Sequence, residues 1–188
     1  MKVLTVTGYK PIELNIFKPN DHRIVFIKEA IKKRLISYIE EEGLEWVILS
    51  GQMGVELWTS QVVLDLKESY EINLGVIPPF QEQEGRWPEQ YQNDYQEIVM
   101  LADFHQTIYD DTYKGPYQFK ARDKWLIEKS DACLILLDEE HPSSTRFFLD
   151  EAQKAYNNNA YPIYTITPFD LEEVVMQMQD EISDWNQD

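Results

Sequence analysis

Short runs of apolar and β-branched residues alternate along this chain with longer segments of helical period, and no other feature limits its fold as strongly. Because parallel strands must be joined by long crossovers, usually helices, such alternation is typical of βαβ units. The runs that predict strands lie at residues 2–7, 46–49, 74–77, 104–109, 132–137 and 163–166. The segment after the first run shows the helical period, with apolar residues spaced by three and four at Ile24, Ile27, Ile31, Leu35 and Ile39.

The sequence therefore predicts an α/β fold: a single Rossmann-like, doubly wound domain with a mostly parallel sheet of about six strands and helices on both faces. A chain of 188 residues has an ordinary length for one domain, and it contains no repeat, low-complexity tract or linker. We expect the domain to span residues 1–169 and an acidic helix at 170–188 to pack on it. In such folds ligands bind beyond the carboxyl ends of the strands, so the loops that follow strands are candidate sites.

The chain is strongly acidic, and its charge is uneven. It holds 34 Asp and Glu against 17 Lys and Arg, a formal net charge of −17, yet residues 1–43 alone hold 8 basic and 6 acidic side chains. Nucleic acid binding needs many basic contacts to phosphate, and anionic membrane surfaces repel an acidic protein, so we expect neither partner. Solubility is the ordinary explanation of the charge, but a helix N-terminus can still bind one small phosphate-bearing ligand.

A single cysteine, Cys133, lies inside the apolar run at 132–137, which is typical of an inert core thiol and excludes a disulfide within the chain. No run reaches the roughly 18 apolar residues of a membrane span, and the first residues lack the pattern of a signal peptide. The expected location is therefore the cytoplasm. No metal site is expected, because His22, His105 and His141 show no metal-ligand spacing.

The loop after the second predicted strand, Ser50-Gly51-Gln52-Met53-Gly54, is the sharpest local signal of a binding site. Glycines allow a tight turn there and let a ligand approach free N–H groups at the start of a helix. The loop lacks the third glycine of the dinucleotide fingerprint and the Lys-Ser/Thr pair of a P-loop, and a plain strand-to-helix turn is the commoner meaning of such a pattern. Glu56, in the first helical turn, either complements the helix dipole or contacts ribose hydroxyls.

Thr7, Gly8 and Lys10 follow the first predicted strand. Gly8 would permit a sharp exit, and Lys10 either contacts a phosphate or is an ordinary surface lysine. Two glycine turns at the ends of adjacent strands would face one crevice, so we predict that both loops contribute to one ligand site. Arg122 is a further candidate for contact with an anion, although a solvated helix face also explains it. Asp138 lies at the ligand-facing end of the fifth predicted strand.

Other chemistry has less support. Arg86 and Trp87 lie in a long polar loop and could close over a bound ring, but an exposed loop with one aromatic is commoner. No G-x-S-x-G elbow occurs, so nucleophilic hydrolysis has no positive support.

Five motifs occur in order along the chain: Thr7-Gly8-Tyr9-Lys10-Pro11, Ser50-Gly51-Gln52-Met53-Gly54-Val55-Glu56-Leu57-Trp58, Pro79-Phe80-Gln81-Glu82-Gln83-Glu84, Gln118-Phe119-Lys120 and Lys129-Ser130-Asp131. Together they resemble the YpsA-like proteins of Gram-positive bacteria, and the resemblance runs from Met1 to about Thr167. That family is placed in the SLOG superfamily. The resemblance implies a Rossmann-like domain that binds a nucleotide or a derivative such as NAD or ADP-ribose, and a connection to bacterial cell division.

The resemblance also brings relatives whose activities differ. The cytokinin-activating phosphoribohydrolases, once labelled lysine decarboxylases, carry the motif P-G-G-x-G-T-x-x-E after a later strand. The corresponding stretch here, residues 141–148, has no glycine and has Phe148 in place of the glutamate, which argues against hydrolysis of an N-glycosidic bond. The DNA-processing protein DprA is another relative, but a net charge of −17 without a basic stripe argues against a DNA role.

The resulting expectation is a cytoplasmic protein that binds or senses a nucleotide or nucleotide derivative and is not primarily a catalyst. The expected ligand-binding residues are Thr7, Gly8, Lys10, Ser50, Gly51, Gln52, Gly54, Glu56, Arg122 and Asp138. Two alternatives remain open: an enzyme that cleaves a nucleotide N-glycosidic bond with Glu56 as acid/base, and a protein-interaction module without a ligand. The second alternative rests on the acidic segment at 170–188, which has an amphipathic spacing and could pack on a partner.

Overall fold

A computed structural model describes residues 1–185 of the chain, and these residues form six strands, six α-helices and one short 3-10 helix. The strands are β1 (Val3–Thr7), β2 (Trp46–Leu49), β3 (Asn73–Val76), β4 (Phe104–His105), β5 (Ala132–Leu136) and β6 (Ile163–Ile166). The helices are η1 (Pro11–Leu14), α1 (His22–Glu42), α2 (Val55–Leu66), α3 (Glu89–Leu101), α4 (Tyr117–Glu128), α5 (Thr145–Asn159) and α6 (Pro168–Trp185). The predicted alternation of strands and helices is confirmed.

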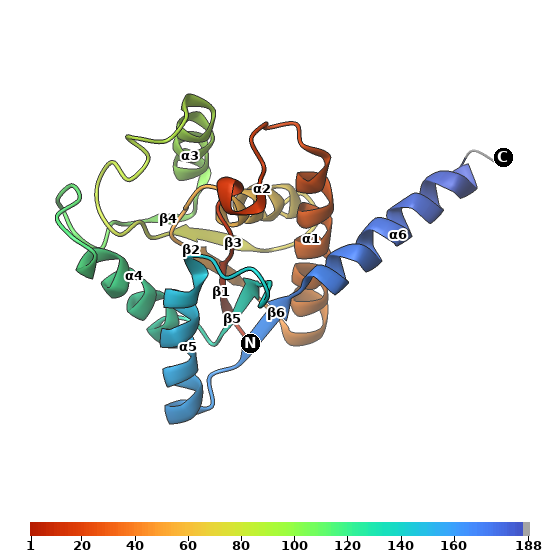
Figure 1. Cartoon of the computed structure of the whole chain (residues 1–188). Helices are drawn as coiled ribbons and strands as arrows, with labels where there is room; N and C mark the ends of the chain where they lie inside the picture. Colours follow the sequence, from red (N-terminus) through yellow and green to blue (C-terminus); the bar gives the residue numbers. More distant parts are fainter. Residues whose placement is uncertain (186–188) are drawn as a thin grey trace.

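All six strands pair in parallel in one sheet, in the order β4-β3-β2-β1-β5-β6 (Figure 1). The chain adds β2, β3 and β4 on one side of β1 and then crosses over to add β5 and β6 on the other. The strand order therefore reverses between β1 and β5. At such a point a doubly wound fold leaves a crevice at the carboxyl ends of its strands. This is the predicted Rossmann-like architecture.

Helices cover both faces of the sheet (Figure 1). α1, α2, α3 and α6 pack on one face, and α4 and α5 pack on the other. Each face has its own apolar core, with Leu134 in the first and Cys133 and Ile135 in the second. Because successive side chains of a strand point to opposite faces, every residue of β5 is buried, which explains its unbroken apolar sequence.

Two local differences from the sequence-based prediction have clear causes. The strand predicted at 104–109 is reduced to β4, whose two residues are exposed at the edge of the sheet. After β4 the chain keeps only scattered bonds, such as the one from the Ile108 N–H to the Pro78 carbonyl at 2.9 Å. The segment between β1 and α1, for which the sequence predicts neither a strand nor a helix, contains η1. Pro11 starts this short helix, and the Glu13 carboxylate accepts the Lys10 N–H at 2.9 Å.

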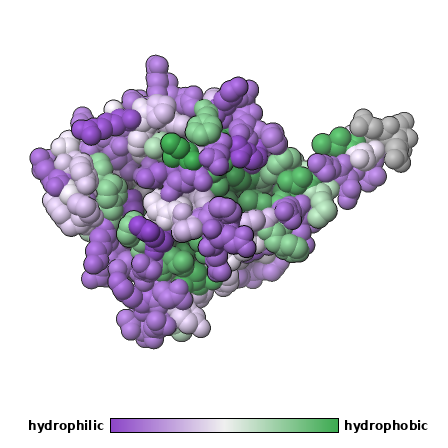
Figure 2. Space-filling model, in the orientation of Figure 1, coloured by the Kyte–Doolittle hydropathy of each residue, from purple (hydrophilic) through white to green (hydrophobic). Residues whose placement is uncertain are grey.

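α6 begins against α1 and then extends away from the rest of the domain (Figure 1). Of its residues only Val174 is buried, whereas Ile182 is 61% and Trp185 is 83% exposed. Figure 2 shows hydrophobic residues along this projecting helix and mainly hydrophilic ones over the rest of the visible face. The acidic helix predicted at 170–188 thus contacts the domain through its first turns, and residues 186–188 lie outside the described residues.

None of the helices in residues 1–185 combines the length and the apolar character that crossing a membrane requires.

Candidate functional site

A cavity of about 540 Å³ opens at the carboxyl edge of the sheet, between α4 and α5. We call it the α4–α5 cavity. Its lining residues come from the ends of β1 and β2, from the first turn of α2 and from the facing sides of α4 and α5. They are Thr7, Gly8, Lys10, Gln52, Glu56, Pro116, Phe119, Lys120, Arg122, Asp123, Ser144, Thr145, Phe147, Phe148, Asp150, Glu151 and Lys154.

The loops after β1 and β2 meet at this cavity. β1 and β2 are neighbours and run in parallel, so their carboxyl ends lie at the same edge of the sheet. Thr7, Gly8 and Lys10 reach the cavity from the first loop, and Gln52 and Glu56 reach it from the second loop and the start of α2. The structure thus brings together five of the ten predicted ligand-binding residues from these two loops, and Arg122 from α4 is a sixth.

The glycines of these loops are explained by contacts within the protein. Gly54 has a φ of +94°, and a Cβ at this position would lie 2.3 Å from the Tyr9 carbonyl oxygen. That oxygen accepts the Val55 N–H at 3.1 Å, so Gly54 lets the start of α2 lie directly against the β1 loop. Gly51 has a φ of +79°, and a Cβ there would lie 2.9 Å from the Tyr95 ring. Gly51 and Gly54 do not line the α4–α5 cavity. They fix the shape of the loop after β2, whose Gln52 does line it.

Glu56 forms part of the cavity wall but is only 6% exposed. Its Oε1 accepts the backbone N–H and the hydroxyl of Ser50, both at 2.8 Å, and its Oε2 accepts the Thr7 hydroxyl at 3.2 Å. Burial raises the pKa of the Glu56 carboxyl above its usual range, while Arg122 and the bonds from Ser50 act in the opposite direction. Ser50 is therefore not a lining residue but a partner of Glu56, which it fixes in place at the cavity.

Arg122 and Asp123 form a buried ion pair on α4 beside Glu56. The Nε and Nη2 atoms of Arg122 lie 2.9 and 2.7 Å from Oδ1 of Asp123, and the guanidinium lies 5.2 Å from the centre of the Phe119 ring. Burial raises the pKa of the Asp123 carboxyl, an effect that Arg122 opposes. Two buried carboxylates thus share the neighbourhood of one guanidinium.

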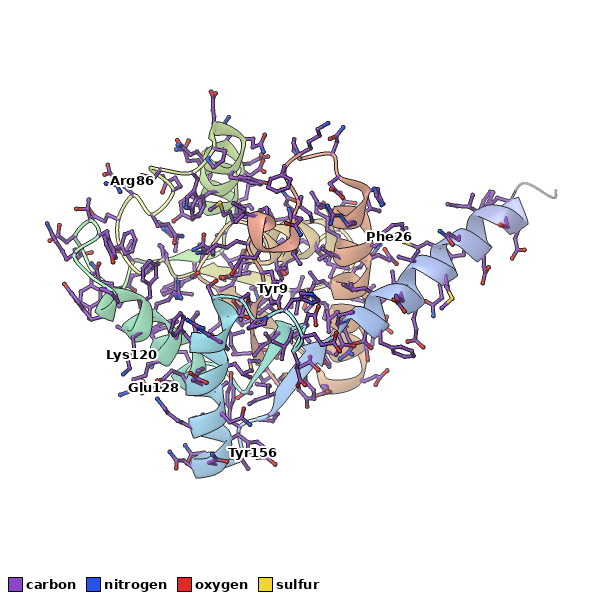
Figure 3. All side chains as sticks on the ribbon, in the orientation of Figure 1. Tyr9, Phe26, Arg86, Lys120, Glu128 and Tyr156 are labelled. Atoms are coloured by element: carbon purple, nitrogen blue, oxygen red, sulfur yellow. The ribbon has the colours of Figure 1, made fainter. Side chains whose placement is uncertain are left out.

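The turn before α4 fixes this helix at the cavity. The Gln118 side chain is fully buried, and its Oε1 accepts the Lys114 N–H at 2.7 Å. This bond anchors the first turn of α4, so that Phe119 and Lys120 come to line the cavity. Figure 3 shows Lys120 on α4.

The segment at 141–148 forms the start of α5 and the opposite wall. The Ser144 N–H and hydroxyl both donate to the Glu13 carboxylate, at 2.8 and 3.1 Å, and the Thr145 N–H donates to the Ser143 hydroxyl at 3.2 Å. Protein groups therefore already satisfy the first N–H groups of α5. Phe148 is buried against the cavity where the phosphoribohydrolase motif has a glutamate, and Glu151 lies one helical turn further on.

Asp138 lies outside the cavity wall. Its carboxylate contacts the His141 ring at 2.8 Å, and its backbone N–H donates to the Tyr9 hydroxyl at 3.0 Å. The same hydroxyl donates to the His141 carbonyl at 2.6 Å, so Tyr9 ties the loop after β5 to the loop after β1. Asp138 thus belongs to a structural tie beside the candidate site.

Several other residues considered from the sequence also lie elsewhere. Trp87 packs on Tyr95 with ring centres 5.5 Å apart, and Figure 3 shows Arg86 in the loop beside α3, away from α4 and α5. Burial raises the pKa of the Cys133 thiol to about 12, which fits an inert core cysteine. Residues 1–185 contain no cluster of three or more His, Cys, Asp or Glu that could hold a metal ion.

Sequence reasoning missed the side chains that α4 and α5 place in the cavity, namely Phe119, Asp123, Phe148 and Glu151. Their signal was present but ambiguous. An aromatic residue at helical spacing is typical of a core position, and charged residues on a helix are typical of its solvated face. The burial of Asp123 beside Arg122 could be predicted only from the topology, which brings α4 to the cavity at the end of β1.

The model of the YpsA family, described as a SLOG family, matches residues 4–171 of this chain. A UPF0398 protein of Oceanobacillus iheyensis is 58% identical over 182 residues, which cover 96% of this chain and 97% of the relative. The UPF0398 protein YpsA of Bacillus subtilis is 45% identical over 172 residues, 91% of this chain and 95% of the relative.

Among solved structures, DNA processing protein A of Helicobacter pylori, studied for its single-stranded DNA binding mode, superposes with a TM-score of 0.57. The superposition covers 95% of this chain and 81% of the other, at 14% sequence identity. At this identity the likeness concerns the fold alone.

Proposed function

This chain belongs to the YpsA family of SLOG proteins, and from that membership and the geometry above we propose that it binds a nucleotide or nucleotide derivative in the α4–α5 cavity. One observation carries the proposal: two strand-end loops and two helices converge on a single cavity of about 540 Å³ at the point where the strand order reverses. Ligand pockets usually measure roughly 300–1,000 Å³ and lie at this point of doubly wound folds.

The lining side chains suit the three parts of a nucleotide. Phe119 and Phe148 offer apolar walls for a planar base. Lys10 and Lys120 supply positive charge for a phosphate, and neither takes part in the ion pairs of residues 1–185. Glu56 is positioned to accept further hydrogen bonds from ribose hydroxyls, because a carboxylate has about four acceptor sites and only three donors reach it here.

The acidic surface of the protein restricts the ligand to a small one. With a net charge of −17, long-range repulsion opposes a nucleic acid strand, whereas a single phosphate can be bound by a few local cations. The proposal is confined to ligand binding. No contact in the site supports the link to cell division that the family resemblance implies, so the proposal does not include it.

Thermal unfolding with a panel of NAD, ADP-ribose and nucleoside monophosphates tests the proposal. A ligand at 100 times its Kd stabilises the folded state by about 2.7 kcal/mol, which raises Tm by roughly 5–10 °C for a chain of this size. Lys120→Glu should abolish the rise. Lys124→Glu, on the same helix but outside the α4–α5 cavity, should preserve it. No rise with any member of the panel would refute nucleotide binding.

A second candidate function is cleavage of the N-glycosidic bond of such a ligand, and the burial of Glu56 favours it. A carboxyl at a cavity wall whose pKa is raised by burial is the kind of group that general acid/base catalysis uses. The absence of the phosphoribohydrolase glutamate at Phe148 argues against this candidate. Chromatography of the ligands after incubation decides: intact ligand supports binding alone, whereas release of free base that Glu56→Gln abolishes would establish the enzyme.

A further inference from the structure

One apolar stripe runs along the length of α6. It consists of residues at successive spacings of four, three, four and three positions: Leu171, Val175, Met178, Ile182 and Trp185. This spacing places the five side chains on one side of a helix and is typical of a seam that packs against another helix. The stripe is therefore a single packing surface.

Only the first half of this stripe is covered. Leu171 and Met178 pack against the apolar core on the α1 side of the sheet, whereas Ile182 is 61% and Trp185 is 83% exposed. No glycine or proline interrupts residues 169–185, so α6 is one continuous helix. Figure 1 shows its end directed away from the domain. Another molecule is therefore needed to cover the outer half of the stripe.

The covered half of α6 shows which kind of surface the helix fits. It packs on α1, with Val174 buried, and polar contacts flank this apolar one. The Asp170 carboxylate lies 3.7 Å from the Arg34 guanidinium, and the Lys33 Nζ donates to the Gln177 Oε1 at 2.6 Å. The existing contact thus combines apolar packing with basic side chains of α1 against acidic and polar side chains of α6.

The exposed parts of the two helices are also complementary in charge. α6 holds six acidic side chains and no Lys or Arg, whereas residues 18–36 hold six basic and two acidic side chains. Asp180 and Asp184 beside the bare half of the stripe are exposed, as are Lys18 and Lys32, and none of the four makes an ion pair in residues 1–185. Opposite charges of this kind steer and orient association.

Apolar side chains lie exposed among the basic residues of this segment. Phe17, shortly before α1, is 69% exposed, and Val25 is 54% exposed. Val25 and Lys32 are two helical turns apart and share one face of α1, on which Glu29 between them is only partly exposed. We call Phe17, Lys18, Val25 and Lys32 the α1 patch. It offers what the outer half of α6 lacks, namely apolar contact next to positive charge.

We propose that the outer half of α6 docks on the α1 patch of a second copy of this chain, whose own α6 docks on the first copy in return. Ile182 and Trp185 cover the apolar side chains of the patch, and the acidic side chains around them meet its lysines. Each copy carries both surfaces, so one twofold pairing satisfies both. Direct pairing of two α6 ends would instead bring like charges together. The residues that line the α4–α5 cavity come from neither helix, so this inference stands apart from the proposed function.

Sedimentation equilibrium measures the assembly. At about 100 μM, which populates even a weak interface of small area, the mass should be twice that of the 22.3 kDa chain. The double variant Ile182→Glu, Trp185→Glu should be monomeric. Met100→Glu, at a position that is 84% exposed on α3, should remain dimeric. A monomeric wild-type protein at this concentration, or loss of the dimer in Met100→Glu, would overturn the proposal.

A charge exchange tests which surfaces meet. Lys18→Glu with Lys32→Glu makes the α1 patch acidic, and Asp180→Lys with Asp184→Lys makes the end of α6 basic. All four side chains are exposed, so both double variants should keep the Tm of the wild-type protein. Each should be monomeric alone, whereas their equimolar mixture should dimerise, because both of its contacts join opposite charges. A dimer of the α1 variant alone, or a mixture that stays monomeric, would exclude the proposed contact.

Discussion

Replacing Gly54 by alanine is expected to destabilise the protein by about 4 kcal/mol, because two costs add at this position. The first is conformational: φ is +94° and ψ is −131°, a backbone state that costs a residue with a Cβ about 1–3 kcal/mol. The second is steric. The new Cβ would lie 2.3 Å from the Tyr9 carbonyl oxygen and 2.9 Å from the Lys10 Cα, and relieving such overpacking costs about 1–3 kcal/mol more.

Gly43→Ala is the matched control, because it carries the conformational cost without the steric one. Its φ is +70°, and the nearest atom to an added Cβ is the flexible Lys2 Nζ at 3.9 Å. This variant should lose about 1 kcal/mol. At roughly 2–4 °C per kcal/mol, Tm should fall by roughly 8–16 °C for Gly54→Ala and by roughly 2–4 °C for Gly43→Ala.

The assay is thermal and urea unfolding followed by circular dichroism, without any ligand. Without ligand, the measurement reports only the contribution of Gly54 to folding stability and not any contribution of Gly54 to binding. Equal losses of stability in the two variants would refute the reasoning, because they would show that the contact with the β1 loop adapts to a side chain.

Three further perturbations test other parts of the structure. Burial raises the pKa of Glu56 in the folded protein above its value of 4.5 in the unfolded chain, so the free energy of unfolding falls as pH rises above about 4.5. Glu56→Gln removes this titration, and the Tm of the variant minus that of the wild-type protein should therefore increase with pH from about 4.5 upward. A Tm difference independent of pH would contradict this. Thr5→Val removes a fully buried hydroxyl that has no hydrogen-bond partner in residues 1–185, and urea unfolding should show a gain of about 1 kcal/mol, not a loss. Tyr9→Phe removes the tie to Asp138 and His141, should cost about 1–2 kcal/mol and should speed hydrogen exchange of the Asp138 amide, which unchanged exchange would disprove.

The elements of this fold follow from local physics, and the sequence predicts them well. The apolar run at 132–137 and the three- and four-residue spacing in α1 depend only on which side chains avoid water, and both elements formed where expected. The short β4 differs because an edge strand is limited by its single neighbour, which no local pattern reveals.

The candidate site is only half predictable, and the reason is topological. Thr7, Gly8 and Glu56 come from loops whose strands are adjacent, a relation that consecutive βαβ units imply. The opposite wall comes from α4 and α5, which cross to the other face after β4, and no residue pattern marks that crossing. Asp123 is the clearest case, because nothing local distinguishes its burial from the exposure of Lys124 beside it.

The pairing of β1 with β5 also governs when the cavity can exist during synthesis. The Val3 N–H bonds the carboxylate of Asp131, 128 positions away, and β5 follows directly. A chain leaving the ribosome therefore holds β1 with one open edge until about two thirds of its length has been made, and such an edge invites misassociation. Of the two helical walls of the cavity, α4 precedes β5 in the chain and α5 follows it. The cavity is therefore complete only after α5 has been made, and a ligand of this site can stabilise the chain only from that point on.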